Sequence, residues 1–248
     1  MDKGSFTIAT LNLQSGVFVT KGYWQYVFTF WKYWLPHSDR PLRRAADFMR
    51  RNDVDVSLWT EISDSSLRTG FTSQAHKIAS LLKDWHHAFL RAHASHPISV
   101  EGSAVLSRFP ISAKKPYPLT SGAITRVLGY ALIELAGRRV HFFVAHLSLS
   151  QPLRLIQMKE IVDIINATEG PVILGGDFNT KDEALSYISE NSRLKDCGAI
   201  PTFPSWNPKV PFDRIFISPE FVCSSLHVDS SSLFSDHLPL VAKISFAD

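Results

Sequence analysis

The stretch PVILGGDFN, residues 171–179, determines how the rest of the chain is interpreted. Residues 172–174 are apolar on both alternating faces of an extended segment, so a strand here needs cover on both sides. Asp177 and Asn179 follow two residues apart, which places them about 7 Å apart on one face if the extended backbone continues. The two glycines before them leave room for a ligand to approach the backbone. The stretch therefore predicts a buried strand that ends at a binding site.

Two further stretches share this two-sided apolar pattern: SFTIATLN, residues 5–12, and VHFFVAHLS, residues 140–148. Helical patterns alternate with the strands. Apolar residues recur at helical spacing in 41–51, and the segment 152–167 opens with a proline in its first turn. The chain shows no internal repeat, low-complexity segment or credible linker. We therefore expect one α/β domain over residues 1–248, with its sheets inside a layered structure.

The composition is that of an ordinary globular protein and excludes several classes. Of the 248 residues, 45% are hydrophobic and 20% charged, and 26 basic against 23 acidic residues give a net charge of +3. This charge permits an anionic substrate but does not indicate wrapping of a nucleic-acid duplex. The two cysteines, Cys197 and Cys223, suggest neither a disulfide framework nor a structural zinc site. Without a signal peptide or a membrane-spanning apolar run, we expect a cytoplasmic or peripheral membrane protein.

Polar side chains recur where the predicted strands begin or end. They are Asn12, Glu61, His146, Asp177, Asn179, Asp213, Asp236 and His237. One such residue alone is usually a loop or cap residue. The whole set at one rim would make a cleft lined by several carboxylates and two imidazoles. Because like charges repel, a hard divalent cation is the natural neutraliser of such a cleft.

Seven motifs, in this order, closely resemble the endonuclease/exonuclease/phosphatase superfamily, the deoxyribonuclease-like metal-dependent phosphoesterases. They are TLNLQ (10–14), WTE (59–61), GSAVLSRFPI (102–111), AHLS (145–148), GGDFN (175–179), TFPSWNPKVPFDRIFIS (202–218) and SDHLPL (235–240). The resemblance covers nearly the whole chain. The TFP…FDRIF form is most similar to the small stand-alone bacterial members and the sphingomyelinase-type branch. The resemblance implies a four-layer αββα sandwich of two mixed β-sheets flanked by helices.

The resemblance also implies hydrolysis of a phosphate ester with magnesium or manganese (Mg²⁺ or Mn²⁺). On this basis Glu61 is expected to be the principal metal ligand, with Asn12 beside it and Asp236 as a second carboxylate on the metal side. Asp177 resembles the residue that orients or deprotonates the attacking water, and Asn179 the residue that positions this water and the phosphate. A metal and carboxylates of this kind suit the chemistry of a charged phosphodiester.

The same resemblance assigns His146 and His237 as imidazoles that bind the phosphate. Asp213 is expected to pair with one of them, His237, and to favour its charged form. Arg126 stands where many members carry an arginine that contacts phosphate. The sequence departs from the family at Ser103, where relatives often have asparagine, and this leaves one substrate contact open. It also has Trp-Thr before Glu61 in place of Leu-Gln, a change that flanks the ligand.

The most unusual segment is YWQYVFTFWKYWLP, residues 23–36, in which eight of the first twelve residues are aromatic. It lies in an aromatic-rich insertion at about residues 17–38. Its polar residues Lys21, Gln25, Thr29 and Lys32 form one narrow stripe on a helix. A helix of a dozen residues reaches about 18 Å, too short to cross a bilayer.

Four interpretations of this helix remain open: packing under a lid, contact with a membrane interface, stacking on single-stranded nucleic acid, and self-association. We favour a membrane or substrate platform built from Trp24, Phe28, Trp31 and Trp34. The sequence thus predicts a phosphodiesterase that acts on a phospholipid or sphingolipid, with lipid favoured over nucleic acid as the partner. The alternatives are a nuclease that uses the rings as a base platform and a non-catalytic binding module. No protein partner can be inferred.

Overall fold

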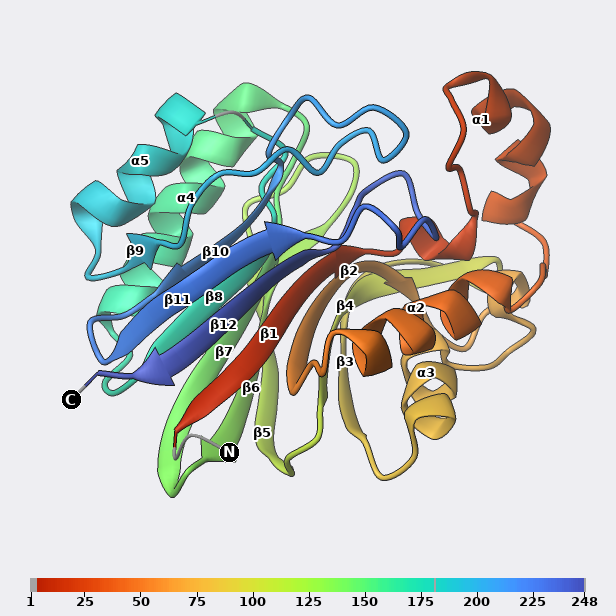
Figure 1. The fold of residues 1–248 in the computed structure, drawn as a ribbon. Helices are drawn as coiled ribbons and strands as arrows, with labels where there is room; N and C mark the ends of the chain where they lie inside the picture. The colour runs from red at the N-terminus through yellow and green to blue at the C-terminus, as the bar shows by residue number, and fades with distance from the viewer. Residues whose placement is uncertain (1–3, 181, 248) are drawn as a thin grey trace.

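Two stacked β-sheets form the centre of the molecule, and helices cover the outer face of each sheet (Figure 1). The computed structural model describes residues 4–180 and 182–247. Both sheets have six strands and are mixed, since most neighbours are antiparallel while β1–β2 and β7–β8 are parallel. The predicted four-layer αββα sandwich of two mixed sheets is therefore confirmed.

The first sheet has the strand order β11 (Phe221–Val228), β12 (Leu240–Phe246), β1 (Ser5–Asn12), β2 (Val56–Ser63), β4 (Ser99–Ser107), β3 (His86–Ser95). The second has the order β5 (Ile111–Leu119), β6 (Arg126–Leu135), β7 (Arg138–His146), β8 (Val172–Asp177), β10 (Asp213–Ile217), β9 (Lys195–Asp196). The helices α2 (Arg40–Arg51) and α3 (Gln74–Leu82) cover the first sheet, and α4 (Gln151–Asn166) and α5 (Asp182–Asn191) cover the second.

The strand β8 shows why a two-sided apolar pattern requires this arrangement. Ile173 points into the cluster between the two sheets, while Val172 and Leu174 belong to the cluster beneath α4 and α5. All three are fully buried, and burial of each such side chain contributes about 1.5–3 kcal/mol. A strand that was apolar on one face only would leave one of these layers without its contacts.

The strand register places the functional residues at one edge of the sandwich. Asp177, at the end of β8, pairs with His146 on the parallel strand β7 and with Asp213 on the antiparallel strand β10. In the other sheet, Asn12 ends β1 beside Thr60 of β2. The carboxyl ends of the two parallel pairs thus bring side chains from both sheets to the same edge.

Glu61 owes its position to an irregularity in β2. The pairing of β2 with β4 shifts register between Trp59 and Ile62, and Glu61 has a φ of +49°. A bulge of this kind redirects a side chain, and positive φ in a residue other than glycine is a strained conformation often found at functional sites. The Trp59 side chain points away from this edge into the core beneath α2 and α3.

The aromatic-rich insertion follows β1 and stands out from one end of the sandwich (Figure 1). Its helical part is short: α1, Trp24–Thr29, continues directly into a 3₁₀ turn, Phe30–Tyr33. The side chain of Gln25 accepts hydrogen bonds from the backbone N–H groups of Thr20 and Lys21, which fixes the start of the helix. Within the described residues, no helix is both long enough and apolar enough to cross a membrane.

Candidate active site

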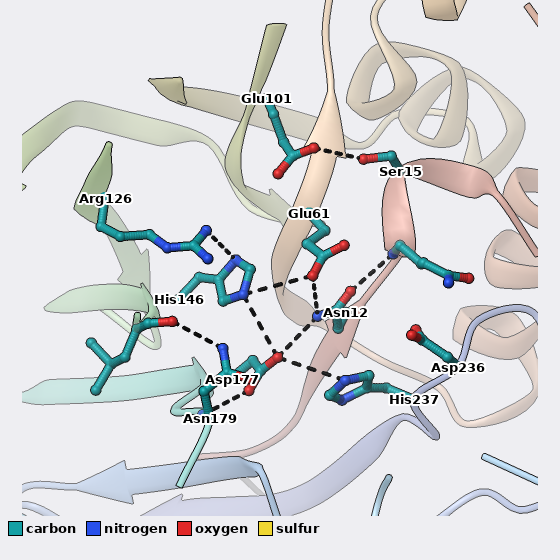
Figure 2. Close-up of polar contacts among 12 residues, drawn as sticks. Asn12, Ser15, Glu61, Glu101, Arg126, His146, Asp177, Asn179, Asp236 and His237 are labelled. Carbon is teal, nitrogen blue, oxygen red and sulfur yellow. Dashed lines mark hydrogen bonds and ion pairs between the residues drawn. The ribbon is translucent and has the colours of Figure 1, made fainter. Parts of the chain in front are cut away.

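The polar residues at the strand ends surround the carboxylate of Asp177 (Figure 2). Its Oδ2 atom accepts a hydrogen bond from Nδ2 of Asn12 at 3.0 Å, and the Nε2 atoms of His146 and His237 lie 3.8 and 3.7 Å from the same oxygen. Its Oδ1 atom accepts from the backbone N–H of Asn179 at 2.9 Å. The structure therefore gathers side chains from both sheets around one acidic group.

The environment of Asp177 suits it to accept a proton. The residue is 1% exposed, and this burial raises the pKa of its carboxyl above the ordinary value. The positive charge of His237 and the hydrogen bonds from Asn12 and Asn179 oppose the shift but do not cancel it. A carboxylate with a raised pKa is a stronger base, so Asp177 can take a proton from a bound water.

His237 is held in its charged form by a buried aspartate. Its Nδ1 donates to Oδ2 of Asp213 at 2.7 Å, and the hydroxyl of Thr202 donates to the same oxygen at 2.6 Å. Burial alone would lower the pKa of His237, but the charges of Asp213 and Asp177 outweigh it and raise this pKa to about 10. The imidazolium therefore presents a second N–H, on Nε2, toward Asp177. The structure forms the Asp213–His237 pair that the sequence suggested.

His146 is the opposite case, a neutral imidazole. The guanidinium of Arg126 donates from Nη1 to Nδ1 of His146 at 3.1 Å. Because a guanidinium has no acceptor, Nδ1 must be unprotonated, and the hydrogen lies on Nε2. Burial, with the charges of Arg126 and His237, lowers the pKa of His146 well below 6.5. Nε2–H thus faces Glu61 at 3.7 Å and Asp177 at 3.8 Å.

Arg126 consequently lies on the side of the His146 ring that faces away from Asp177 (Figure 2). In this position it sets the tautomer of His146. Its expected contact with phosphate stays a prediction. A small recess lined by Arg126, His146, Ser103 and Ile124 adjoins this side of the site. Ser103, the departure from the family pattern, is buried and lines this recess, so its part in substrate contact stays open.

Asn12 connects the two sheets rather than offering its oxygen to the site. Its Nδ2 donates to Oε1 of Glu61 at 3.2 Å and to Asp177 at 3.0 Å, while its Oδ1 accepts from the backbone N–H of Gln14 at 2.9 Å. In this structure the amide thus orients two carboxylates. The expected place of Asn12 beside the metal stays a prediction.

Asp236 lies at the side of the site nearest the aromatic insertion. Its Oδ1 accepts from the hydroxyl of Ser235 at 3.0 Å, and its Oδ2 accepts from the hydroxyl of Tyr26 at 2.5 Å. Tyr33, on the same inward side of the insertion, receives a hydrogen bond from Nε2 of Gln14 at 3.3 Å. The inward direction of these two tyrosines was not predicted from the sequence, in which all the aromatic residues of the segment look alike.

The donor set is compatible with a divalent cation. Burial and the charges of Glu101 and Asp236 raise the pKa of Glu61 well above its ordinary value, which marks an excess of negative charge. Among the residues that the structure describes, no group of three Asp, Glu, His or Cys side chains is placed to hold a metal by itself. Mg²⁺ commonly uses only one or two carboxylates and completes its shell with water and substrate phosphate. Glu61 and Asp236 would be those carboxylates.

The hydrogen bonds that support Glu101 were not predicted from the sequence. This carboxylate accepts a hydrogen bond at Oε2 from the hydroxyl of Ser15 at 2.9 Å (Figure 2). The guanidinium of Arg68 donates to the same oxygen at 3.0 Å. The position of Glu101 one residue before the GSAVLSRFPI motif was the only available signal. The charge of Glu101 contributes to the raised pKa of Glu61, while its own carboxylate is bonded by Arg68.

A scan against protein families matches residues 9–237 to the Endonuclease/Exonuclease/phosphatase family. The chain belongs to this family. Its members are generally phosphoester hydrolases, and they typically use divalent metals. The order of the seven motifs along the chain and the converged site of Figure 2 agree with this membership. A search of curated proteins found no match.

Solved structures of this family share the fold at low sequence identity. An endonuclease/exonuclease/phosphatase from Beutenbergia cavernae has 21% identity and a TM-score of 0.75, over 98% of this chain and 72% of that one. A mannosyl-6-phosphatase from Bacteroides thetaiotaomicron has 16% identity and a TM-score of 0.73, over 97% and 100% of the chains. The beta toxin of Staphylococcus aureus has 19% identity and a TM-score of 0.69, over 96% and 99%. Small stand-alone bacterial members are among these relatives, as predicted, and the sphingomyelinase-type branch stays a prediction.

Proposed function

We propose that this chain is a divalent-metal-dependent phosphodiesterase that hydrolyses a phospholipid or sphingolipid at a membrane surface. Family membership gives the class of phosphoester hydrolase. The observation that supports a lipid substrate is an exposed aromatic surface directly beside the catalytic residues. We define the aromatic surface as the outward side chains of the insertion: Tyr23, Trp24, Val27, Phe28, Phe30, Trp31, Trp34 and Leu35.

The aromatic surface is unusually exposed for a soluble domain. Its side chains have exposed fractions between 42% for Trp31 and 69% for Phe28. Large contiguous apolar patches on a protein surface usually mark a binding site, and tryptophan and tyrosine favour the headgroup level of a bilayer. The exposure argues against the interpretation that the helix is packed beneath a lid.

Three residues of the polar stripe, Gln25, Thr29 and Lys32, are half-buried against the protein, whereas Lys21 is exposed before the helix begins. The hydroxyl of Thr29 donates to the carbonyl of Gln25 at 2.7 Å, and Nζ of Lys32 donates to the carbonyl of Val17 at 2.9 Å. Gln25, Tyr26, Thr29, Lys32 and Tyr33 are all half-buried. The helix therefore has its polar groups bonded inside and its apolar rings outside, an orientation suited to an apolar partner.

Two exposed apolar residues stand on other loops of the same edge. Ile124, 55% exposed, precedes Arg126 and lines the recess beside His146. Leu149, 76% exposed, follows His146 by three positions. Apolar contacts on two loops flanking the site, together with the aromatic surface, would bring the catalytic edge against a lipid layer.

In the proposed reaction, Asp177 accepts a proton from the water that attacks phosphorus. The P–O bond to the leaving group breaks, and the departing oxygen takes a proton from solvent to leave as an alcohol. The Nε2–H groups of His237 and His146 donate to the phosphoryl oxygens, where negative charge increases in the transition state. The cation held at Glu61 and Asp236 would supply further charge neutralisation. The charged His237 and the neutral His146 allow one strong and one weaker donor to act together.

The aromatic surface is tested by replacing Trp24, Trp31 and Trp34 together by serine. Removal of three rings that each contribute on the order of 1 kcal/mol or more should weaken binding to phosphatidylcholine–phosphatidylglycerol vesicles by at least about 10-fold. The measurement is cosedimentation with the vesicles. The matched control is Val222→Ser on the edge strand β11, which removes an apolar side chain that is 51% exposed.

Equal vesicle binding by the triple variant and the wild type would contradict the lipid proposal. A variant that instead loses cleavage of single-stranded DNA, from a wild type that ignores vesicles, would favour a nuclease with these rings as a base-stacking platform.

A further inference from the structure

The insertion has a second feature besides its aromatic surface: two tyrosine hydroxyls point into the site. Tyr26 and Tyr33 lie on the inward side of the helix, and both are half-buried. Burial and the charges of Asp236 and Glu61 raise the pKa of both phenols above the ordinary value, so both act as neutral hydrogen-bond groups. The Tyr26 hydroxyl bonds directly to Asp236, a residue of the candidate active site. The Tyr33 hydroxyl instead accepts a hydrogen bond from Gln14.

The Tyr26 contact joins parts of the chain that are distant in sequence. Its hydroxyl donates to Oδ2 of Asp236, a residue 210 positions away, at 2.5 Å. The other oxygen of Asp236 accepts from Ser235, and the backbone carbonyl of Asp236 accepts from the N–H of Ser205 at 2.7 Å. The tyrosine therefore completes the set of bonds that fixes the direction of this carboxylate.

We propose that Tyr26 is a positioning residue of the catalytic edge: the insertion that contacts lipid also supplies the hydroxyl that orients Asp236. This inference rests on the proposed function for the role of Asp236 and extends it to the insertion. Groups that hydrogen-bond a metal-binding carboxylate determine its orientation, and their loss commonly reduces activity or metal affinity by about 10–100-fold.

The lipid-contacting rings and the Tyr26 hydroxyl are expected to move together. Tyr26 is two residues after Trp24 and two before Phe28, so one short helix carries both the exposed rings and the hydroxyl on Asp236. A displacement of this helix would move the hydroxyl away from Asp236. The insertion is thus a part of the active site and not an independent anchor.

The test is Tyr26→Phe, which removes the hydroxyl and retains the ring. The matched control is Tyr187→Phe on α5. Tyr187 is half-buried like Tyr26, but it packs against the second sheet. Three quantities are measured for each protein: kcat on the soluble diester bis(p-nitrophenyl) phosphate, the Kd for Mn²⁺ by calorimetry without substrate, and binding to phosphatidylcholine–phosphatidylglycerol vesicles.

We expect Tyr26→Phe to lower kcat and weaken Mn²⁺ binding by about 10-fold or more, while its vesicle binding equals that of the wild type. Tyr187→Phe should match the wild type in all three. Wild-type kcat and Mn²⁺ affinity in Tyr26→Phe would overturn the proposal, as would a defect confined to vesicle binding.

A double-mutant cycle distinguishes orientation of Asp236 from a general loss of structure. In an Asp236→Asn background, Tyr26→Phe should cause no further loss of Mn²⁺ affinity, because the carboxylate that it orients is absent. The same loss in both backgrounds would overturn the proposal. If the wild type does not bind vesicles, the proposed lipid substrate is contradicted, but the Tyr26 proposal is not, because the kcat and Mn²⁺ measurements do not use lipid.

Discussion

Two histidines of opposite charge state characterise the site at the scale of single residues. Asp213 and Asp177 keep His237 charged, whereas burial and the charge of Arg126 keep His146 neutral. The difference comes from the partner of each Nδ1 atom: a carboxylate accepts from one ring and a guanidinium donates to the other. The two rings therefore cannot exchange roles, although the sequence assigns both to phosphate binding.

Replacement of Asp213 by asparagine tests the charge on His237. Without the carboxylate, His237 should be neutral near pH 8, and kcat should fall about 100-fold, as for loss of one donor to the transition state. In the wild type, activity should persist until the pH rises through about 10, the raised pKa of His237. The measurement is the pH–rate profile of each protein. If activity falls at the same alkaline pH in both, Asp213 does not keep His237 charged.

The same pair makes a pH-dependent contribution to stability. The pKa of His237 is raised from 6.5 to about 10 in the folded state, so the contribution is fully present below pH 6.5 and is lost as the pH rises through about 10. Urea unfolding at pH 6 and pH 10 should show a larger loss in the wild type than in Asp213→Asn. A loss of equal size in both proteins would count against the pair as its source.

Glu61 is expected to decrease stability in the absence of metal. Its raised pKa reflects burial and repulsion from Glu101 and Asp236, so Glu61→Gln should raise the free energy of unfolding of the metal-free protein by about 1 kcal/mol at pH 8. The same change should abolish Mn²⁺ binding. If Glu61→Gln is less stable than the wild type without metal, the charge of Glu61 does not destabilise the metal-free protein, contrary to this prediction.

At the scale of secondary-structure elements, the strands could be predicted and the exact presentation of side chains could not. The two-sided apolar pattern of β8 requires a buried strand, and Asp177 and Asn179 follow it at its end. The orientation of Glu61 depends on a bulge against β4, which arises from pairing between distant segments and leaves no local pattern. The contact of Tyr26 with Asp236 depends on how the insertion packs against a distant loop, so the sequence did not predict it either.

The insertion also shows a limit of helical periodicity as evidence. The sequence predicted one helical face of Lys21, Gln25, Thr29 and Lys32, and a polar stripe ordinarily faces solvent. In the structure Lys21 is exposed and lies before α1, whereas the other three are half-buried. Here backbone carbonyls and N–H groups of the insertion itself bond that face, which leaves the rings outside. Periodicity identifies which residues share a face, and only the tertiary structure identifies its partner.

Gln25→Ala tests how the helix is anchored. The change removes the acceptor for the N–H groups of Thr20 and Lys21, and each lost hydrogen bond contributes about 1 kcal/mol. Hydrogen exchange over residues 20–34 should therefore accelerate by about 10-fold, while exchange in β8 is unchanged. Leu155→Ala, on the exposed side of α4, is the control. Wild-type exchange rates in the insertion would show that Gln25 does not hold it.

At the scale of the whole molecule, the two sheets bring their functional strand ends to one edge, and the exposed apolar residues of three loops lie at the same edge. Asn12 bonds Glu61 of its own sheet and Asp177 of the other, so the site exists only when the sandwich is assembled. The insertion then adds both the aromatic surface and Tyr26. Catalysis and membrane contact are therefore expected to depend on one common face.

The most direct test of the lipid proposal is Mg²⁺-dependent hydrolysis of mixed phospholipid vesicles, with single-stranded and duplex DNA measured in parallel at the same salt concentration. Asp177→Asn is the control, because it removes the proposed base and preserves the shape of the side chain. The lipid proposal predicts hydrolysis of the vesicles by the wild type, its loss in Asp177→Asn, and intact DNA. Cleavage of DNA with unchanged vesicles would contradict it.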